Sequence, residues 1–513
     1  MMAGTTTCMR INVTERLTEE QLIPALKTNP LGRLFGTKLV RYLFRILPFE
    51  LHRPIPPDTL YFHNDYTQPA AERAVAVGHR LQQLGIIERV DRRDRKYHDE
   101  PKLFSYSAFS PEPPRNIGHG YDFFDQTSAL WKCLAETTER YLWRSYDFYS
   151  GRDVVFAPQK DLRAPYVSLD SITGFSAEQR RAAGLPALDD TTSFSWLRMS
   201  SLSAGGERYL PLQLVSNRYY REHVDRPGSA ATSTAHTEPI IRWCITTGLG
   251  SGQHLIDAQV SGLLEIIERD AFMITYLNSI TPPQVDLAAV AATDPALKDV
   301  LDRFVRYGLR LHVIKLVTDF NVAAYGAIII DESGKGPAIS VASAADISPK
   351  RALLRAVTEV FAVRLSLKES VGTIITKPKE QFDQEDRLVY WATDLAHVEK
   401  LAFLLAGPRE TIDDDGDVAR TGRALQPRYR QSDLDELVAQ FKAKGLDLLW
   451  TELTSPEVRA LGLRVTKMVA PQLQPLHLLE TLPYISGSRL DTVPVALGYQ
   501  AAAIKNPEPH PFP

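Results

Sequence analysis

The chain of 513 residues has little cysteine: its three cysteines, Cys8, Cys133 and Cys244, lie far apart and form no Cys-x-x-Cys pair. This scarcity excludes a disulfide framework and a structural zinc site built on cysteine. Three reduced thiols in a cytoplasmic protein are the simplest interpretation.

Long apolar runs are also missing, because no segment approaches the roughly 18 apolar residues of a transmembrane helix. The first residues, MMAGTTTCMRINVTERL, lack the basic stretch and apolar core of a secretory signal. The formal net charge of −3 argues against a general nucleic-acid binder. With 44% hydrophobic and 24% charged residues, the composition predicts a soluble globular protein long enough for more than one domain.

The chain does contain the string Leu-x-Glu-x-x-Glu-Arg twice, at residues 133–143 (CLAETTERYLW) and 262–272 (GLLEIIERDAF). Helical spacing places Glu265, Glu268 and Arg269 in one polar stripe of an otherwise apolar helix. A helix that is apolar nearly all round is buried, so this stripe must face an internal cleft. The first copy repeats the arrangement with Glu136, Glu139 and Arg140.

Two interpretations of these carboxylates stay open. The glutamates and arginines could simply pair along and between helices. Alternatively, four carboxylates gathered in one cleft repel each other unless a divalent metal is present, and magnesium held by carboxylates and substrate phosphates is the usual solution in nucleotide chemistry. Because the chain has no Gly-x-x-x-x-Gly-Lys-Ser/Thr loop and no protein-kinase signature, any ATP would bind in an uncommon mode.

A third helix adds positive charge. Ser348 is a good N-cap and Pro349 a good first helical residue, and the helix that follows carries Arg351, Arg355, Glu359 and Arg364. Arg355 and Glu359 are spaced to form an intrahelical pair. An arginine that reaches a phosphate is the functional alternative.

Residues 1–112 read as a separate module. A helix over 70–85 precedes two strands joined by the charged turn DRRDRKYHDEPK, which is the outline of a winged helix. Because acidic residues offset the basic ones, we favour contact with a peptide or partner protein over DNA. A plain solvated hairpin is the alternative.

The body, residues 113–513, alternates helices and strands. Residues 310–317 and 323–331 are predicted strands, 433–445 is a predicted amphipathic helix followed by two strands, and 217–238 and 406–432 are predicted loops. This pattern predicts an α+β or α/β fold with helices on a mixed sheet.

Four segments in a fixed order resemble the YcaO family of ATP-dependent enzymes that modify peptide backbones. They are SALWKCLAETTER, TGLGSGQHLIDAQVSGLLEIIERDAF, RALLRAVTEVFAVR and the terminus NPEPHPFP. The resemblance runs from about Gly118 to the last residue. It implies YcaO-type mixed sheets packed with helices, beside the small winged-helix-like α+β module.

The resemblance also implies a composite site for ATP and Mg²⁺. By position, the magnesium ligands would be Glu136, Glu139, Glu265 and Glu268, and the contacts to ATP would come from Lys132, Gln253, Asp257, Arg269, Arg355 and Arg364, the last also catalytic. Gln253 stands where the family usually has asparagine, Asp257 where it has glutamate, and Ala362 where glutamine is common. The segment GHGYD lacks a frequent lysine.

The terminus has its own chemistry. Pro507, Pro509, Pro511 and Pro513 alternate, which favours a stiff polyproline strut. Alone, such an end is typical of a disordered tail or an SH3 ligand. In azoline-forming relatives a similar tail enters the active site, so the resemblance implies a catalytic carboxylate on Pro513.

The resemblance therefore implies a cyclodehydratase that forms thiazoline or oxazoline rings from Cys, Ser or Thr of a ribosomally made, bacteriocin-like precursor peptide. The alternatives are a thioamide or macroamidine synthetase, and an inactive scaffold or winged-helix regulator. We expect a precursor peptide and a separate leader-peptide-binding protein as partners, and no nucleic acid or membrane. Whether the chain forms a homodimer stays open.

Overall fold

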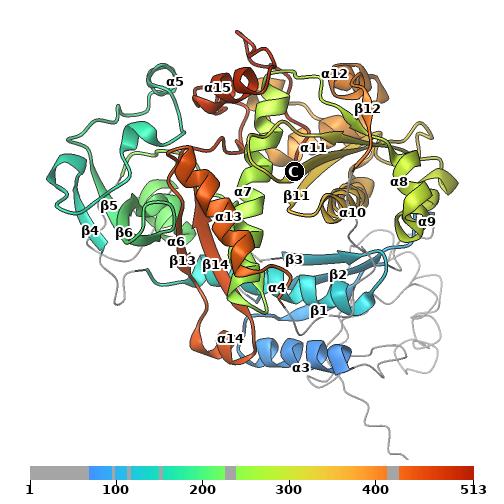
Figure 1. The fold of residues 1–513 in the computed structure, drawn as a ribbon, viewed down its shortest axis with the longest axis horizontal. Coiled ribbons are helices and arrows are strands. Elements are labelled where there is room, and N and C mark those ends of the chain that lie inside the picture. The colour runs from blue at the N-terminus through green and yellow to red at the C-terminus, as the bar shows by residue number, and fades with distance from the viewer. Residues whose placement is uncertain (1–68, 95–98, 112–116, 149–153, 226–237, 413–426) are drawn as a thin grey trace, which may run out of the picture.

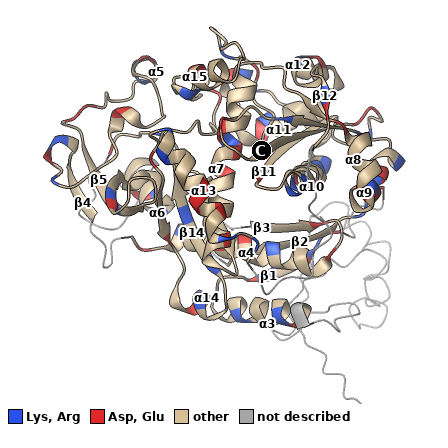
Figure 2. Ribbon diagram, viewed as in Figure 1, with Lys and Arg blue, Asp and Glu red and all other residues tan. Residues whose placement is uncertain are grey.

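The computed structural model describes residues 69–94, 99–111, 117–148, 154–225, 238–412 and 427–513. These residues form three sheets with helices packed between and around them (Figure 1), which confirms the predicted α+β class. Acidic and basic residues are interspersed over the elements (Figure 2). Among the described residues, no helix combines the length and apolar character needed to cross a membrane.

Each sheet has its own strand order. The three-stranded sheet has the order β1(Arg89–Arg92), β2(Phe104–Phe109), β3(Ile117–Asp122). The five-stranded sheet has the order β11(Ile339–Asp346), β10(Ala323–Ile330), β9(Arg310–Lys315), β8(Gln284–Val285), β12(Arg409–Glu410). The six-stranded sheet has the order β4(Val154–Pro158), β5(Ser193–Ser201), β13(Leu449–Glu452), β14(Arg464–Val469), β7(Leu249–Gly252), with β6(Glu207–Pro211) paired to β5.

The helices vary widely in length. In the described part of the chain the α-helices are α3(Pro69–Gln83), α4(Gln126–Ser145), α5(Ala177–Ala182), α6(Asn217–Tyr220), α7(Leu255–Leu277), α8(Leu287–Thr293), α9(Pro295–Arg306), α10(Pro349–Leu367), α11(Gln384–Thr393), α12(Ala402–Leu405), α13(Gln431–Ala443), α14(Pro456–Ala460) and α15(Arg489–Ala496). Short 3₁₀ turns cover Gln159–Asp161, Leu169–Ser171, Leu212–Leu214, Lys368–Ser370, Lys379–Gln381 and Leu395–Leu401, and Arg221–Asp225 is π-helical.

The five-stranded sheet is buried on both faces. Successive side chains of a strand point to opposite faces. In β10, Tyr325, Ala327 and Ile329 accordingly pack with α8, α9 and α10, while Ile328 and Ile330 pack in a second core with α7, α11 and the end of the chain. The strands predicted at 310–317 and 323–331 are β9 and β10, so both predictions are confirmed.

Helix α7 joins two cores. Its first half, including Leu263 and Ile267, packs with α13 and β14, and its second half, from Ala271 onward, packs with β10, β11 and α11. At about 1.5 Å per residue, its 23 residues span roughly 35 Å. Figure 1 shows α7 in the middle of the molecule, between the six-stranded and five-stranded sheets.

The N-terminal elements match the predicted outline, with α3 followed by the β1–β2 hairpin. The sheet continues across residue 112, because β2 pairs with β3, and Leu81 of α3 shares a core with Leu134 of α4. The division at 112 stays a prediction. Residues 1–68 of this module, and part of its charged turn, lie outside the described residues.

The two predicted loops contain more structure than expected. Residues 217–225 are helical, since Ser216 caps α6 by accepting from the Tyr219 backbone N–H. In the second loop, β12 adds to the edge of the five-stranded sheet by pairing with β8. Both elements depend on partners distant in sequence or on a local cap, which a polar composition conceals.

Candidate active site

The first carboxylate helix lies unusually close to a strand. Asp125 caps α4 by accepting from the backbone N–H groups of Thr127 and Ser128. The helix packs on β3, where a Cβ on Gly120 would lie 1.9 Å from the Ala129 carbonyl oxygen. A Cβ on Gly118 would also collide with the helix backbone. The segment GHGYD is therefore glycine-rich because the helix and the strand touch there.

The second carboxylate helix repeats this construction. A Cβ on Gly250 of β7 would lie 2.0 Å from the carbonyl oxygen of Ala258 in α7. Gly248 has a φ of +89°, and its Cβ would clash with the Met468 carbonyl. Each Glu-x-x-Glu-Arg helix thus packs closely on a strand that has glycines at the contact. This close packing brings backbone N–H groups within reach of the first glutamate of each pair.

In α4, Glu136 is tied to that strand. Its Oε2 accepts from the His119 backbone N–H at 2.6 Å, and its Oε1 lies 2.6 Å from the Arg140 guanidinium. Burial, with the nearby Glu265 and Glu136 carboxylates, raises the pKa of Glu139 to about 8 although the Ser251 hydroxyl opposes the shift. Glu139 therefore lies among other acids and lacks a full counter-charge.

In α7, Glu265 occupies the place equivalent to Glu136. It accepts from the Gly248 backbone N–H at 3.0 Å and from Arg269 at 3.2 Å. Glu268 is buried and accepts from the Ser343 hydroxyl at 2.7 Å, the Ala345 backbone N–H at 3.2 Å and Arg269. Burial raises the pKa of Glu268, and the charges of Arg269 and Arg355 oppose that shift.

The third helix, α10, adds a fifth carboxylate that the sequence interpretation paired with Arg355. The pKa of Glu359 is raised, first by desolvation in its surroundings and then by Glu136 and Glu268, while Arg355 opposes the shift. The side chain is nevertheless open to solvent. Glu359 is therefore accessible to water and close enough to the carboxylates of α4 and α7 for their charges to act on it.

Arg355 itself points to the strand beside it. It donates to the Ala345 carbonyl at 2.8 Å and lies 3.8 Å from Asp346. Asp346, fully buried at the end of β11, also binds Arg351 and the Tyr429 hydroxyl. Burial would raise the pKa of Asp346, but Arg351 and Arg355 hold it below its ordinary value. Sequence reasoning missed Asp346, although its place just before the Ser348 cap is a usable signal.

The donor set fits a divalent oxygen-loving cation. Five glutamates from three helices meet three arginines, Arg140, Arg269 and Arg355. Five carboxylates facing three guanidinium groups leave negative charge in excess, and burial first, with neighbouring carboxylates second, raises the pKa values of Glu139, Glu268 and Glu359. Magnesium is held by carboxylate oxygens together with substrate phosphates, so Mg²⁺ with a bound nucleotide would relieve this excess.

The comparison with known families agrees with this geometry. The family model described as "YcaO cyclodehydratase, ATP-ad Mg2+-binding" matches residues 119–474, well over half of the chain. The chain belongs to the YcaO family. All four glutamates of the repeated motif fall inside the matched range.

Individual relatives and solved structures resemble this chain at low identity. An uncharacterized protein of Methanothermobacter thermautotrophicus is 24% identical over 297 residues, 56% of this chain and 68% of the relative. The structure described as a heterocyclase in complex with substrate and cofactor superimposes with a TM-score of 0.64 at 19% identity, covering 88% of this chain but 59% of the heterocyclase. The YcaO protein of Methanopyrus kandleri bound with AMPPCP and Mg²⁺ gives 0.53 at 17% identity, covering 79% and 91%.

Three further residues with YcaO-like positions lie in α4 and at the start of α7. Lys132 is exposed and donates to the Tyr121 carbonyl and to Asp122, both at 2.9 Å. Its positive charge also opposes the rise in the pKa of Glu359. Gln253 lies between β7 and the N-cap of α7. Asp257, in the first turn of α7, accepts from the backbone N–H groups of residues 428 and 429, at 2.8 and 3.1 Å.

Arg364 lies apart from the glutamates. It is buried near the C-terminal end of α10, about 13 Å along the helix from Arg355. Its guanidinium binds both oxygens of Glu100, at 2.9 and 3.0 Å, and Asp331 at 2.7 Å. In this conformation it fastens the segment before β2 to the body. The ATP contact inferred for Arg364 from the YcaO resemblance stays a prediction.

The end of the chain returns to α7. The Phe512 ring is buried, packs against Phe272 with centroids 4.8 Å apart, and carries the Arg269 guanidinium 4.2 Å above its centroid. The tail thus reaches the arginine that binds Glu265 and Glu268. Pro513 follows directly, and Figure 1 shows the chain end beside α7.

Proposed function

We propose that this chain is an ATP- and Mg²⁺-dependent cyclodehydratase that forms azoline rings in a ribosomally made precursor peptide. The observation that carries the proposal is the meeting of five glutamates from α4, α7 and α10 beside a buried, proline-rich chain end. Membership of the YcaO family and the likeness to a heterocyclase support it.

Within this proposal Glu136, Glu139, Glu265 and Glu268 hold Mg²⁺, and Glu359 joins them. Bound magnesium would neutralise the charge of the nucleotide phosphates. Arg269 and Arg355 are the cations positioned beside these carboxylates, and Lys132, Gln253 and Asp257 lie at the rim where the rest of ATP would bind.

The reaction requires that a poor leaving group become a good one. The thiol or hydroxyl of a substrate Cys, Ser or Thr attacks the preceding backbone carbonyl carbon, and its proton passes to a base. The resulting oxyanion takes the γ-phosphoryl group of ATP, which leaves ADP. Loss of phosphate with the amide proton then gives the C=N bond of the ring. The Pro513 carboxylate, one residue beyond the Phe512 ring that Arg269 contacts, is the candidate base, and fixed cations stabilise the phosphoryl transfer.

A cleft next to Arg269 is the candidate path for the peptide. It is lined by Arg269, Arg242, Trp243, Lys467 and Gln474, among others. Burial lowers the pKa of Lys467 to about 8. The N-terminal module, residues 1–112, would contact the peptide or a separate leader-binding protein in the cytoplasm.

The direct test incubates the purified chain with ATP, Mg²⁺ and a Cys- or Ser-containing peptide encoded beside its gene, with and without its partner. Mass spectrometry should show loss of water from the peptide, with ADP formed in step. Exchange of oxygen for sulfur would indicate a thioamide synthetase instead. No peptide-dependent ADP under any of these conditions would contradict the proposal.

A further inference from the structure

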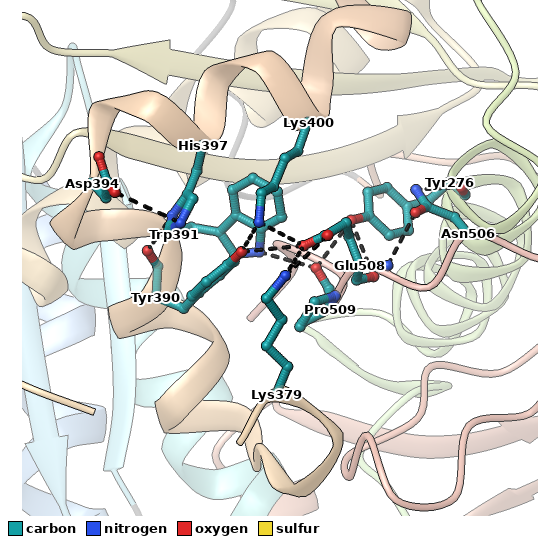
Figure 3. Close-up of polar contacts among 10 residues, drawn as sticks. All are labelled: Tyr276, Lys379, Tyr390, Trp391, Asp394, His397, Lys400, Asn506, Glu508 and Pro509. Carbon is teal, nitrogen blue, oxygen red and sulfur yellow. Dashed lines mark hydrogen bonds and ion pairs between the residues drawn. The ribbon is translucent and has the colours of Figure 1, made fainter. Parts of the chain in front are cut away.

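The last eight residues are held tightly although they form no helix or strand. His510 and Phe512 are 1% and 2% exposed. The Pro509 carbonyl accepts from the Trp391 indole and from the Tyr276 hydroxyl, each at 3.0 Å (Figure 3). The backbone N–H of Asn506 donates to the last residue of α7 at 2.7 Å. The tail is therefore a fixed part of the core.

Glu508 is the charged anchor of this tail. Its carboxylate accepts from Lys379 at 2.9 and 3.0 Å, from Lys400 at 3.0 Å and from the Tyr390 hydroxyl at 3.1 Å. Figure 3 shows the two lysines approaching from opposite sides. Burial opposes ionisation, but the lysines hold the pKa of Glu508 below its ordinary value. We call Lys379, Tyr390 and Lys400 the Glu508 clamp.

The prolines on either side of Glu508 limit how far the chain end can move independently of Glu508. Glu508 stands between Pro507 and Pro509, and prolines fix φ near −65°. Five residues of polyproline chain, at 3.1 Å each, cover about 15 Å from Glu508 to Pro513. Moving the anchor would therefore move the chain end, since few backbone torsions can absorb the shift.

Beyond the clamp, the His510 ring meets the His477 carbonyl at 3.0 Å and lies near Glu480. These two histidines and Glu480 bring ligand-type atoms within 4.8 Å of one another. Arg387, however, already lies 3.4 Å from Glu480, and a buried metal cation would face that guanidinium. We therefore assign the group to packing of the tail.

We propose that Glu508 is a positioning residue, and that the Glu508 clamp sets the positions of Phe512, whose ring contacts Arg269, and of the Pro513 carboxylate that follows it. The catalytic consequence rests on the proposed function, whereas the placement of the tail does not. The three clamp residues lie 129, 118 and 108 residues earlier in the chain, in and around α11, so this region contributes to the reaction without contacting substrate.

The kinetic test compares Glu508→Gln with a chain ending at Phe512. Glu508→Gln should lower kcat for peptide-dependent ADP formation about 10- to 100-fold, with the KM for ATP within about twofold, because a small displacement of a reacting group is costly. Combining both changes should add little to the larger effect, since both act through one carboxylate. If the combined variant lost kcat by the product of the two separate losses, the proposal would be overturned.

Two controls separate positioning from general damage. Asp491→Asn removes an ion pair with Lys505 at 2.8 Å just upstream of the tail and should leave kcat unchanged. The double variant Lys379→Met with Lys400→Met should lower kcat as much as Glu508→Gln does. The single variant Lys400→Arg, which keeps the positive charge, should retain most of the wild-type kcat. A double-lysine variant with normal kcat would contradict the clamp.

Amide hydrogen exchange measures the order of the tail independently of catalysis. Past Glu508, only His510 and Phe512 carry a backbone N–H, so exchange in the C-terminal peptide reports directly on their order. Glu508→Gln should speed this exchange at least about tenfold, as local opening becomes easier. Unchanged exchange would reject the clamp. If the wild-type chain modifies no peptide but its exchange responds as expected, the proposed function fails and the clamp stands.

Discussion

The guanidinium of Arg269 lies over the ring of Phe512, 4.2 Å from its centroid, while the same group binds Glu265 and Glu268. One cation therefore serves two carboxylates of the candidate metal site and the penultimate residue of the chain. A guanidinium held on an aromatic face and by two acids has a fixed orientation. The state of the tail and the charge of the metal site are consequently linked.

The carboxylates of α7 should be indispensable for turnover. Glu265→Gln and Glu268→Gln should each lower kcat for peptide-dependent ADP formation about 100-fold or more, because charge on the phosphates loses its stabilisation. Steady-state assays over a range of Mg²⁺ concentrations measure this. Asp299→Asn, which changes an exposed acid on α9, is the matched control and should be neutral. Full activity in either glutamine variant would refute the metal assignment.

Glu139 should make the stability of the metal-free protein depend on pH. Its folded pKa of about 8 exceeds the ordinary value of 4.5, so the folded state holds a proton that the unfolded state has lost. Stability from this group is full below about pH 4.5 and declines as pH rises through about 8. Wild-type Tm without Mg²⁺ should thus fall more steeply across this window than the Tm of Glu139→Gln.

Magnesium should reverse that trend. Because the metal requires ionised carboxylates, Mg²⁺ with a nucleotide should raise the Tm more at about pH 8 than at about pH 6. Thermal melts with AMPPCP at both pH values test this. An equal rise at both values would show that Glu139 does not titrate with binding.

Replacing Arg364 should lower the stability of the fold. Arg364→Met leaves the buried Asp331 without its guanidinium partner and Glu100 paired with Lys368 alone, which should lower the free energy of unfolding by about 3 kcal/mol. Denaturant titration measures the loss, and nucleotide binding by the variant that remains folded tests the ATP contact inferred for Arg364. A stable Arg364→Met variant that no longer binds nucleotide would instead support the direct ATP contact.

Two glycines should respond in opposite ways to alanine. Gly250→Ala would place a methyl group 2.0 Å from the Ala258 carbonyl oxygen and should destabilise the fold by about 1–3 kcal/mol or more. Gly78, inside α3, has only ordinary contacts with the Leu134 side chain near its missing Cβ, at 3.6 Å. Gly78→Ala should stabilise by about 0.5–1 kcal/mol. Equal effects on Tm would contradict the close approach of β7 to α7.

The sequence predicted the helices of the site well because their signals are local. Spacing placed Glu265, Glu268 and Arg269 on one stripe of α7, and the cap at Ser348 predicted the start of α10. The two predicted strands, β9 and β10, are likewise continuous apolar runs. Such patterns depend on neighbours within a few residues, and these are visible in the sequence.

What the sequence did not predict depends on distant partners. Glu359 was paired with Arg355 by spacing, but its surroundings include Glu136 from another helix. The bond from Asp257 to the backbone at 428 joins residues 171 positions apart. The ion pair between Lys379 and Glu508 likewise joins residues that are distant in the sequence and meet only in the fold. Periodicity carries no information about such pairs.

Helix α7 has a mechanical consequence. Its two halves belong to different cores, and Glu265, Glu268 and Arg269 lie where one core gives way to the other. A rotation of the six-stranded sheet against the five-stranded sheet would have to bend the helix at these residues. The separation of the carboxylates would then change with the angle between the sheets, so movement of either layer would alter the fit of the metal.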